Sequence, residues 1–177
     1  EPDPSAFESV KDEVSVAFWT FGRPMNLPSK NTSIFEAYDA NNKRTMNVHL
    51  PWSNAGIYWD CGNNGGSYDR ISKTATYEDF RSQWNFWAFT KNNNSGSMKI
   101  YLNGKLWHSE ENKTRPIDIK KFRLGSSTPH GNGYYGMLDE FSFWNKELDE
   151  ASIAALMNQR IDATHPDYSN LIAYYNF

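Results

Sequence analysis

The sequence predicts an all-β protein, an antiparallel β-sandwich with one short helix near its C-terminal end. Two observations carry this prediction. Short segments rich in β-branched and aromatic residues, with apolar and polar positions alternating, recur along the chain. Clusters of Gly, Pro, Asn, Asp and Ser separate these segments, and only one segment has helical spacing. Many short strands with frequent turns and a single helix are typical of a β-sandwich.

The first half of the chain contains five predicted strands. Val14–Phe21 is the longest of them, and it ends where Gly22 and Pro24 interrupt the pattern. Gly and Asn residues at 62–66 predict a turn after the fourth strand. The remaining strands of this half are expected at Ser33–Tyr38, Thr45–Leu50, Ile57–Cys61 and Tyr68–Ser72.

The second half contains the clearest hairpin. Trp84–Thr90 and Ser97–Leu102 are predicted strands joined by a loop at 92–96, and Trp84, Trp87 and Phe89 are expected in the core. Asn103-Gly104 then predicts a type I′ turn, because both residues tolerate positive φ. Further strands are expected at Lys105–His108, Phe122–Gly125, Tyr134–Trp144 and Leu171–Phe177.

The predicted helix begins after Asp149, a residue type that caps helix N-termini. Ile153, Leu156, Met157 and Ile161 follow at the spacing that places apolar side chains on one helical face.

Composition limits the function classes. The 177 residues suit one domain, and 18 basic against 21 acidic residues give a net charge of −3, which disfavours a nucleic-acid binder. Cys61 is the only cysteine, so an internal disulfide and a cysteine-based zinc cluster are excluded, and it is expected to be a small buried residue. No apolar run is long enough for a transmembrane helix. Residues 1–4, Glu-Pro-Asp-Pro, indicate a linker.

Three segments carry a resemblance to a known family: QWNFWAFTKNNNSGSMKIYLNGKLW at 83–107, FRLGSS at 122–127 and YYGMLDEFSFWNKEL at 134–148. Their order and spacing resemble a laminin G-like domain of the concanavalin A-like lectin/glucanase superfamily. NVHLPWSNAGIYWDCG at 47–62 is similar to a variant found in bacterial secreted and surface proteins. The family usually has a strand ahead of VSVAFWTF at 14–21. Here only about a dozen residues precede that segment, so Leu171–Phe177 must close the sheet or a strand is missing.

The resemblance implies a jelly-roll fold over residues 1–177, a single domain excised from a larger multidomain protein that lies outside the cell or on its surface. It also implies a structural calcium ion, because similar sandwiches hold Ca²⁺ with an Asp at the position of Asp139. Carboxylate oxygens are hard ligands that suit Ca²⁺. The alternative for Asp139 is the capping of a local backbone group.

Catalysis is not predicted. Related glucanases carry Glu-Xaa-Asp-Xaa-Xaa-Glu along one strand, and no such run is present. Glu36 and Asp39 are three residues apart, which places them on opposite faces of a strand.

Carbohydrate is the predicted ligand, because aromatic rings can stack on the apolar faces of sugars while polar side chains bind their hydroxyl groups. If Trp59 and Cys61 face the core, Tyr58 and Asp60 face outward. For each tryptophan taken singly, core packing is the favoured role, and Trp52 also faces inward unless Pro51 ends its strand. An ion pair between Asp60 and Arg70 would explain both charges equally well. The predicted ligand-binding residues are His49, Trp52, Tyr58, Trp59, Asp60, Arg70 and Trp107.

The predicted function is therefore a non-catalytic extracellular module that binds carbohydrate through aromatic stacking and polar loop residues, with calcium as an aid. One alternative is a protein-adhesion or spacer module of a surface protein. Another is a polysaccharide-cleaving enzyme on the same fold, which would need two carboxylates converging in one groove.

Overall fold

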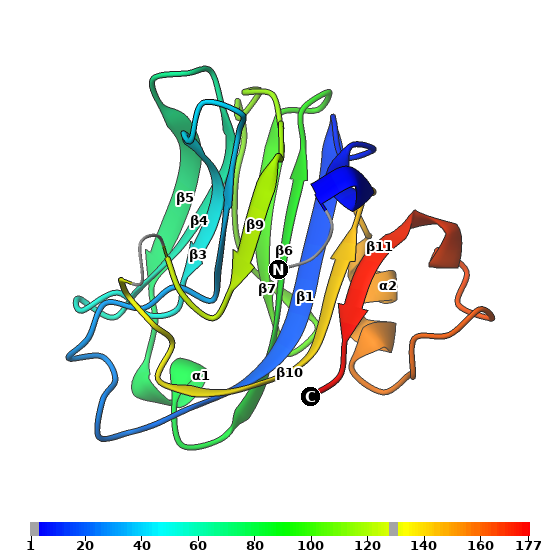
Figure 1. Ribbon diagram of the computed structural model, residues 1–177. Coiled ribbons are helices and arrows are strands. Elements are labelled where there is room, and N and C mark those ends of the chain that lie inside the picture. Colours follow the sequence, from blue (N-terminus) through cyan, green and yellow to red (C-terminus); the bar gives the residue numbers. More distant parts are fainter. Residues whose placement is uncertain (1–3, 128–130) are drawn as a thin grey trace.

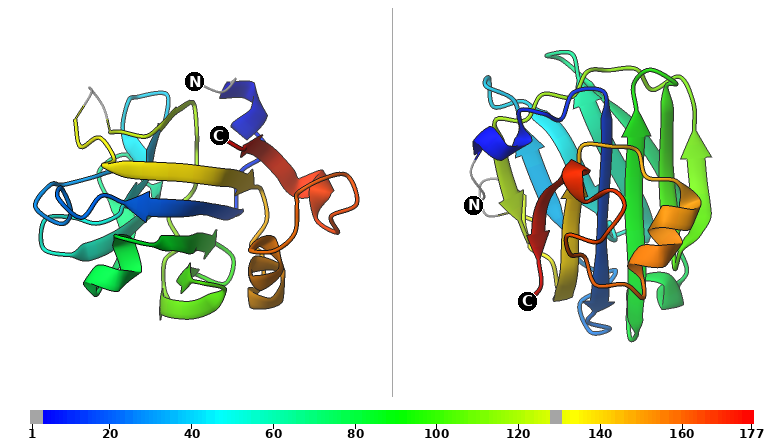
Figure 2. Two further views of the ribbon diagram at one scale, coloured as in Figure 1. Left: turned by 90° about the horizontal axis from the view of Figure 1, so that it is seen from below. Right: turned by 90° about the vertical axis from the view of Figure 1, so that its right-hand side faces the viewer.

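A computed structural model describes residues 4–127 and 131–177. Two antiparallel β-sheets face each other in it, as Figures 1 and 2 show. The sequence prediction of an all-β sandwich is confirmed. Residues 1–3, most of the predicted linker, lie outside the described residues.

The first sheet, called sheet A here, has six strands in the order β11-β10-β1-β6-β7-β8. Its edge strand β11 pairs with β10, so the C-terminal segment does close this sheet as predicted. The strands are β1 (Glu13–Gly22), β6 (Trp84–Asn92), β7 (Ser97–Leu102), β8 (Lys105–Glu110), β10 (Gly136–Trp144) and β11 (Leu171–Tyr175).

The second sheet, sheet B, has five strands in the order β5-β4-β3-β2-β9. All neighbours in it are antiparallel. Its strands are β2 (Phe35–Tyr38), β3 (Arg44–His49), β4 (Gly56–Asn63), β5 (Tyr68–Thr74) and β9 (Lys121–Leu124).

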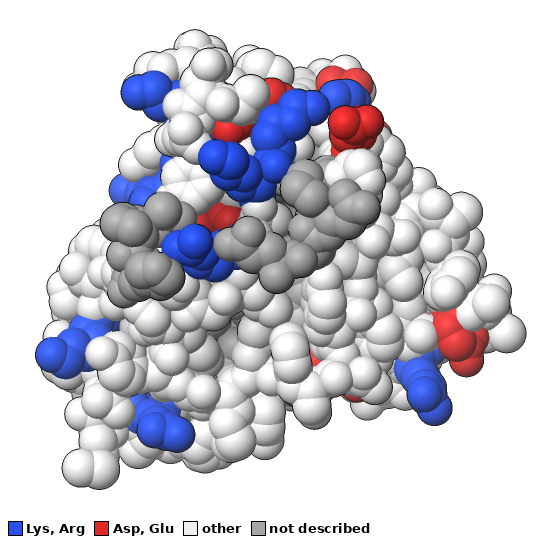
Figure 3. Space-filling model, viewed as in Figure 1, with Lys and Arg blue, Asp and Glu red and all other residues white. Residues whose placement is uncertain are grey.

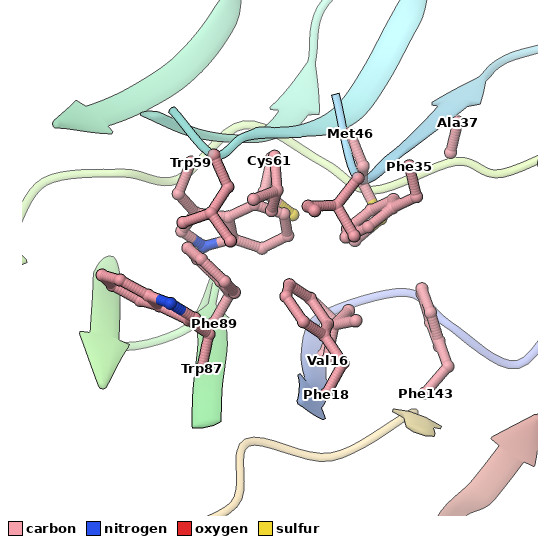
Figure 4. Packing of buried hydrophobic residues seen from close by; sticks show 14 of the residues in the cluster. Val16, Phe18, Phe35, Ala37, Met46, Trp59, Cys61, Trp87, Phe89 and Phe143 are labelled. Atoms are coloured by element: carbon pink, nitrogen blue, oxygen red, sulfur yellow. The ribbon is translucent and has the colours of Figure 1, made fainter. Parts of the chain in front are cut away.

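The core lies between the two sheets and consists largely of aromatic rings. Figure 4 shows Trp59 and Phe35 of sheet B facing Phe89 and Phe18 of sheet A. Phe18 and Phe89 stack with their ring centroids 5.7 Å apart, and Trp59 lies 5.7 Å from Phe89. Cys61 is fully buried here, as predicted, and burial raises the pKa of its thiol to about 12.

A second apolar cluster covers part of the outer face of sheet A. Helix α2 (Glu150–Leu156) begins where Asp149 accepts a hydrogen bond from the backbone N–H of Ser152, at 2.7 Å. The helix lies against the outer face of sheet A (Figure 2, right). Its Ile153 and Leu156 pack against residues of that face. The helix ends at Leu156, earlier than its spacing predicted. The other helical turns are α1 (Tyr77–Phe80), η1 (Pro4–Phe7) and η2 (Tyr168–Asn170), and the sequence did not predict them.

The prediction for Trp84 is wrong. Trp87 and Phe89 are fully buried as expected, but the Trp84 side chain is 43% exposed. Side chains alternate along a strand, so the parity that turns residues 87 and 89 inward turns residue 84 outward. Trp84 contacts Phe21 on this outer face, at the end that α2 does not cover.

Asn103 and Gly104 have φ of 50° and 77°, which confirms the predicted type I′ turn between β7 and β8. Within the described residues, none of the helical segments has the length and apolar character needed to cross a bilayer.

Candidate functional site

A row of polar side chains crosses the outer face of sheet B. In the strand register, Glu36 of β2 lies beside Asn47 of β3, Asn47 beside Asp60 of β4, and Asp60 beside Arg70 of β5. The residues before and after each of these in sequence point the other way. Glu36, Asn47 and Asp60 are each at most 1% exposed, although they lie on an outer face. Larger side chains therefore cover them.

The two carboxylates of this row hold two guanidinium groups. Asp60 accepts two hydrogen bonds from Arg70, with Nε–Oδ1 at 2.6 Å and Nη2–Oδ2 at 2.8 Å. Arg44 bridges the carboxylates, with Nε 2.6 Å from Glu36 and Nη1 3.2 Å from Asp60. The hydrogen bond to Asp60 raises the pKa of Arg70 above its ordinary value. Paired, hydrogen-bonded charges of this kind can be buried, and they fix the guanidinium planes.

Aromatic rings surround these guanidinium groups. The Cζ atom of Arg70 lies 4.9 Å from the ring centroid of Tyr58 and 5.1 Å from that of Tyr68, so Arg70 packs against both rings. Arg44 lies 5.6 Å from the Tyr68 ring. On the other side, the rings of His49 and Trp52 are 4.3 Å apart.

Together these side chains line an open cavity of about 280 Å³. Aromatic surface and cationic hydrogen-bond donors thus share one hollow. Among the described residues, Arg44 Nη2 and Arg70 Nη1 have no hydrogen-bond partner, so these donors remain for a ligand. The lining residues are Arg44, His49, Trp52, Tyr58, Tyr68 and Arg70.

His49 is held in one tautomer. Its Nδ1 lies 2.9 Å from the backbone carbonyl oxygen of Thr32, and a carbonyl can only accept, so Nδ1 carries the hydrogen. Burial lowers the pKa of His49 to about 4. The ring is therefore neutral at pH 7, and its Nε2 is an acceptor among the cationic donors of the cavity.

The family follows from the sequence as a whole. The profile of the concanavalin A-like lectin/glucanases superfamily, in its laminin G type, matches residues 2–154. The chain belongs to this superfamily. No curated protein sequence matches this laminin G-like chain.

Solved structures with the same jelly-roll fold include bacterial toxin domains and a pentraxin. The receptor binding domain of botulinum neurotoxin C/D mosaic serotype has a TM-score of 0.68 at 19% identity, with 86% of this chain and 38% of that chain covered. The botulinum neurotoxin serotype D ligand binding domain, in complex with N-acetylneuraminic acid, has a TM-score of 0.66 at 18% identity, covering 84% and 37%. A SAP-like pentraxin from Limulus polyphemus has a TM-score of 0.64 at 14% identity, covering 94% and 81%. This laminin G-like chain thus spans little more than a third of those toxin domains, and at these identities the likeness concerns the fold.

Four of the predicted ligand-binding residues, His49, Trp52, Tyr58 and Arg70, line the cavity, and Asp60 lies beneath it. Trp52 points to the outer face because β3 ends at His49, the outcome expected if Pro51 interrupts the strand.

Trp59 and Trp107, the other two tryptophans of the predicted set, lie elsewhere. Trp59 faces the core, and its indole N–H donates to the backbone carbonyl of Thr90 at 3.1 Å. Trp107 lies on β8 of sheet A, where it packs edge-on against Trp87 with the Lys73 ammonium 4.6 Å from its ring centroid. Neither side chain lines the cavity.

The Asp139 carboxylate binds backbone N–H groups. Its Oδ1 accepts from the N–H groups of Glu140 and Phe177, at 2.8 and 2.9 Å, which is the capping role considered as the alternative. In the part of the chain that the structure describes, no three or more His, Cys, Asp or Glu side chains gather as a metal site would require. Calcium at Asp139 stays a prediction.

The sequence did not single out Arg44, Tyr68 or Glu36 as site residues. Arg44 pairs with Tyr38 at a register shift between β2 and β3, so simple alternation does not place its side chain. Glu36 lies two strands away from Asp60, and only the antiparallel pairing through β3 brings both to Arg44. A cross-strand pairing of opposite charges would have been the signal to use.

The buried His49 gives a prediction about pH. The unfolded chain binds a proton at this residue below its ordinary pKa of 6.5, whereas the folded chain binds it only near pH 4. The unfolded state therefore holds more protons in this window, so we expect the free energy of unfolding to fall by on the order of 2–3 kcal/mol as the pH drops from 6.5 to 4.

Urea unfolding of the wild type at several pH values between 4 and 7 would measure this change. In His49→Asn, whose amide nitrogen takes the position of Nδ1 and can still donate to Thr32, the slope in this window should flatten, whereas His108→Asn should keep it. Equal slopes in the wild type and His49→Asn would contradict the assignment.

Proposed function

We propose that this chain is a non-catalytic carbohydrate-binding module whose site is the cavity on the outer face of sheet B. One observation carries the proposal: three aromatic side chains and two anchored guanidinium groups line the same open hollow of about 280 Å³. A sugar ring offers apolar C–H faces to aromatic rings and hydroxyl groups to fixed polar atoms. Ligand sites in proteins typically combine a shaped apolar surface with a few placed polar groups.

The cavity supplies both kinds of contact. Trp52, Tyr58 and Tyr68 are half-buried, so parts of their rings remain accessible. Arg44 and Arg70 supply donors held in place by Asp60, and the neutral His49 supplies an acceptor. The Tyr58 hydroxyl accepts from the Asn54 amide at 2.8 Å and keeps its own hydrogen for donation.

The comparisons agree with a binding role. The similar toxin structures are receptor binding domains, and one is in complex with N-acetylneuraminic acid. Since the chain matches only 37% of that toxin domain, the position of that sugar is not carried over. An extracellular or cell-surface location within a larger protein belongs to the same proposal.

A non-catalytic role suits the state of the carboxylates. Glu36 and Asp60 do converge on one guanidinium group, but both are buried and engaged in ion pairs. A general acid or nucleophile must reach the glycosidic bond. Neither of these carboxylates lines the cavity.

Protein adhesion is the second candidate. Trp84 and Met137 are exposed on the outer face of sheet A, with Phe21 between them in the strand register. An apolar strip of this kind favours contact with a protein surface.

Removal of the Trp52 indole should weaken glycan binding by about thirtyfold or more, the usual effect of losing a central aromatic contact. Trp52→Ala and wild type would be compared by titration calorimetry on soluble polysaccharides and their oligosaccharides. Trp84→Ala is the matched control, because it removes an exposed indole from the other sheet. Equal loss in both variants, or no binding of any saccharide by the wild type, would argue against the proposed site.

A further inference from the structure

A second hollow of about 190 Å³ adjoins the first on sheet B. The two share Arg44 and Tyr68 as lining residues, so they lie side by side, with these two side chains at their common border. The rest of the second hollow is lined by Lys43, which ends the β2–β3 turn, and by residues of the β4–β5 turn. A ligand that fills the first hollow can therefore extend toward Lys43.

The charges that face these hollows are all positive. Lys43, Arg44 and Arg70 are the charged residues among the lining side chains, whereas Glu36 and Asp60 are buried beneath them. Each guanidinium is already paired with a carboxylate, so Arg44 and Arg70 are locally neutralised.

Lys43 is different. It is exposed, and within the described ranges no Asp or Glu lies at ion-pair distance from its ammonium group. The neighbouring Asp39 is largely buried and directs its oxygens to the backbone N–H groups of Asn41 and Lys43 and to the Asn63 amide. The ammonium of Lys43 thus remains for an outside anion. Figure 3 shows that Lys and Arg side chains also gather over the part of the surface around β9, at the other edge of this sheet.

We propose that the two hollows form one groove for an acidic oligosaccharide. The first hollow takes a sugar ring between the aromatic side chains, and the second takes an adjacent sugar whose carboxylate or sulfate group pairs with Lys43. This inference rests on the proposed function, and it names the ligand class. An ammonium beside an anionic group forms a charge-assisted hydrogen bond, which is stronger than a neutral one.

The β4–β5 turn offers a way to block the second hollow. A Cβ atom added at Gly66 would meet no protein atom within 4 Å, whereas Gly65 has φ of +87°, which disfavours any other residue. Gly66→Leu should therefore fold normally while its side chain occupies space at the edge of the second hollow.

The experiment is a calorimetric titration with three tetrasaccharides of equal length: one neutral, one built of uronic acids and one sulfated. At low ionic strength we expect at least one acidic tetrasaccharide to bind about tenfold more tightly than the neutral one. Lys43→Gln should remove this preference. Lys105→Gln, at an exposed lysine of sheet A, should keep the preference.

Gly66→Leu should weaken the binding of the tetrasaccharides and leave the binding of a monosaccharide in the first hollow unaffected. Comparing the uronic-acid tetrasaccharide with the sulfated one shows whether the groove prefers a carboxylate or a sulfate group. Suppose that neutral and acidic tetrasaccharides bind equally well and that Trp52→Ala abolishes the binding of both. This result would overturn the inference about acidic ligands and leave the proposed function standing. Acidic preference that survives Lys43→Gln would also overturn it. Absence of binding by every saccharide would refute both.

Discussion

Replacing Lys91 with alanine is expected to lower the free energy of unfolding by about 3–5 kcal/mol, the usual effect of breaking a buried ion pair. Lys91 lies on β6, is fully buried, and reaches across to sheet B. Its ammonium group donates to Asp69 at 2.8 Å, to the backbone carbonyl of Cys61 at 2.8 Å and to that of Arg115 at 2.9 Å. Alanine would leave all three acceptors without this donor.

Asp69 would then carry most of the cost. Burial alone raises the pKa of a carboxyl group, but hydrogen bonds from Lys91 and Arg115 outweigh burial and lower the pKa of Asp69. Without Lys91 the carboxylate would be buried with one cation fewer, and folding would favour its protonated form. The loss of stability should therefore be greater at pH 7 than near pH 4.

Urea unfolding of Lys91→Ala would measure the effect. Lys105→Ala, at an exposed lysine, should change stability by at most about 0.5 kcal/mol. The double variant Lys91→Met/Asp69→Leu should be more stable than Lys91→Met alone, because it removes a buried carboxylate that has lost one of its two cationic partners. A loss under about 1 kcal/mol in Lys91→Ala would show that this pair does not join the sheets.

Asp60→Asn should have the largest effect on ligand binding, a loss of about a hundredfold or more. The substitution keeps the shape of the side chain but replaces one carboxylate oxygen with an amide that donates. Arg44 and Arg70 would then face a donor and lose the charge that balances them. We also expect a loss of stability of about 3 kcal/mol, since Asp60 is fully buried.

Titration with the best-binding saccharide and urea unfolding would be measured on the same preparation. Asp118→Asn is the control, because Asp118 lies 3.7 Å from Lys120 in a solvent-exposed pair, which contributes little. If Asp60→Asn bound the saccharide as well as the wild type, the anchoring of the two guanidinium groups would be irrelevant to recognition.

The fold was predictable from sequence because strand alternation and turn residues act locally. Asn103-Gly104 shows this, since its two positive φ values follow from its residue types alone. Trp84 shows the limit. Its aromatic character predicted burial. However, strand parity decides on which side of sheet A its side chain lies, and the reach of α2 decides whether that side is covered.

The candidate site was predictable where residues close in sequence supply it, namely the end of β3, the turn that follows and β4. His49, Trp52 and Tyr58 lie within ten residues of one another, and they do line one cavity. Arg44 comes from the other end of β3, at a register shift, so its position depends on strand pairing. The alternation of apolar and polar residues does not tell which strands pair with each other. The role of Glu36 depends on that pairing and was therefore not predicted either.

The anchoring of Arg44 and Arg70 by buried carboxylates has a consequence for selectivity between epimers. A guanidinium held by two hydrogen bonds and flanked by tyrosine rings cannot swing to follow a hydroxyl that points elsewhere. A sugar with one inverted hydroxyl would leave a donor unsatisfied in a partly desolvated site, which costs far more than the lost contact. The rigid frame should thus distinguish stereoisomers of equal size and charge, and little side-chain ordering would accompany binding.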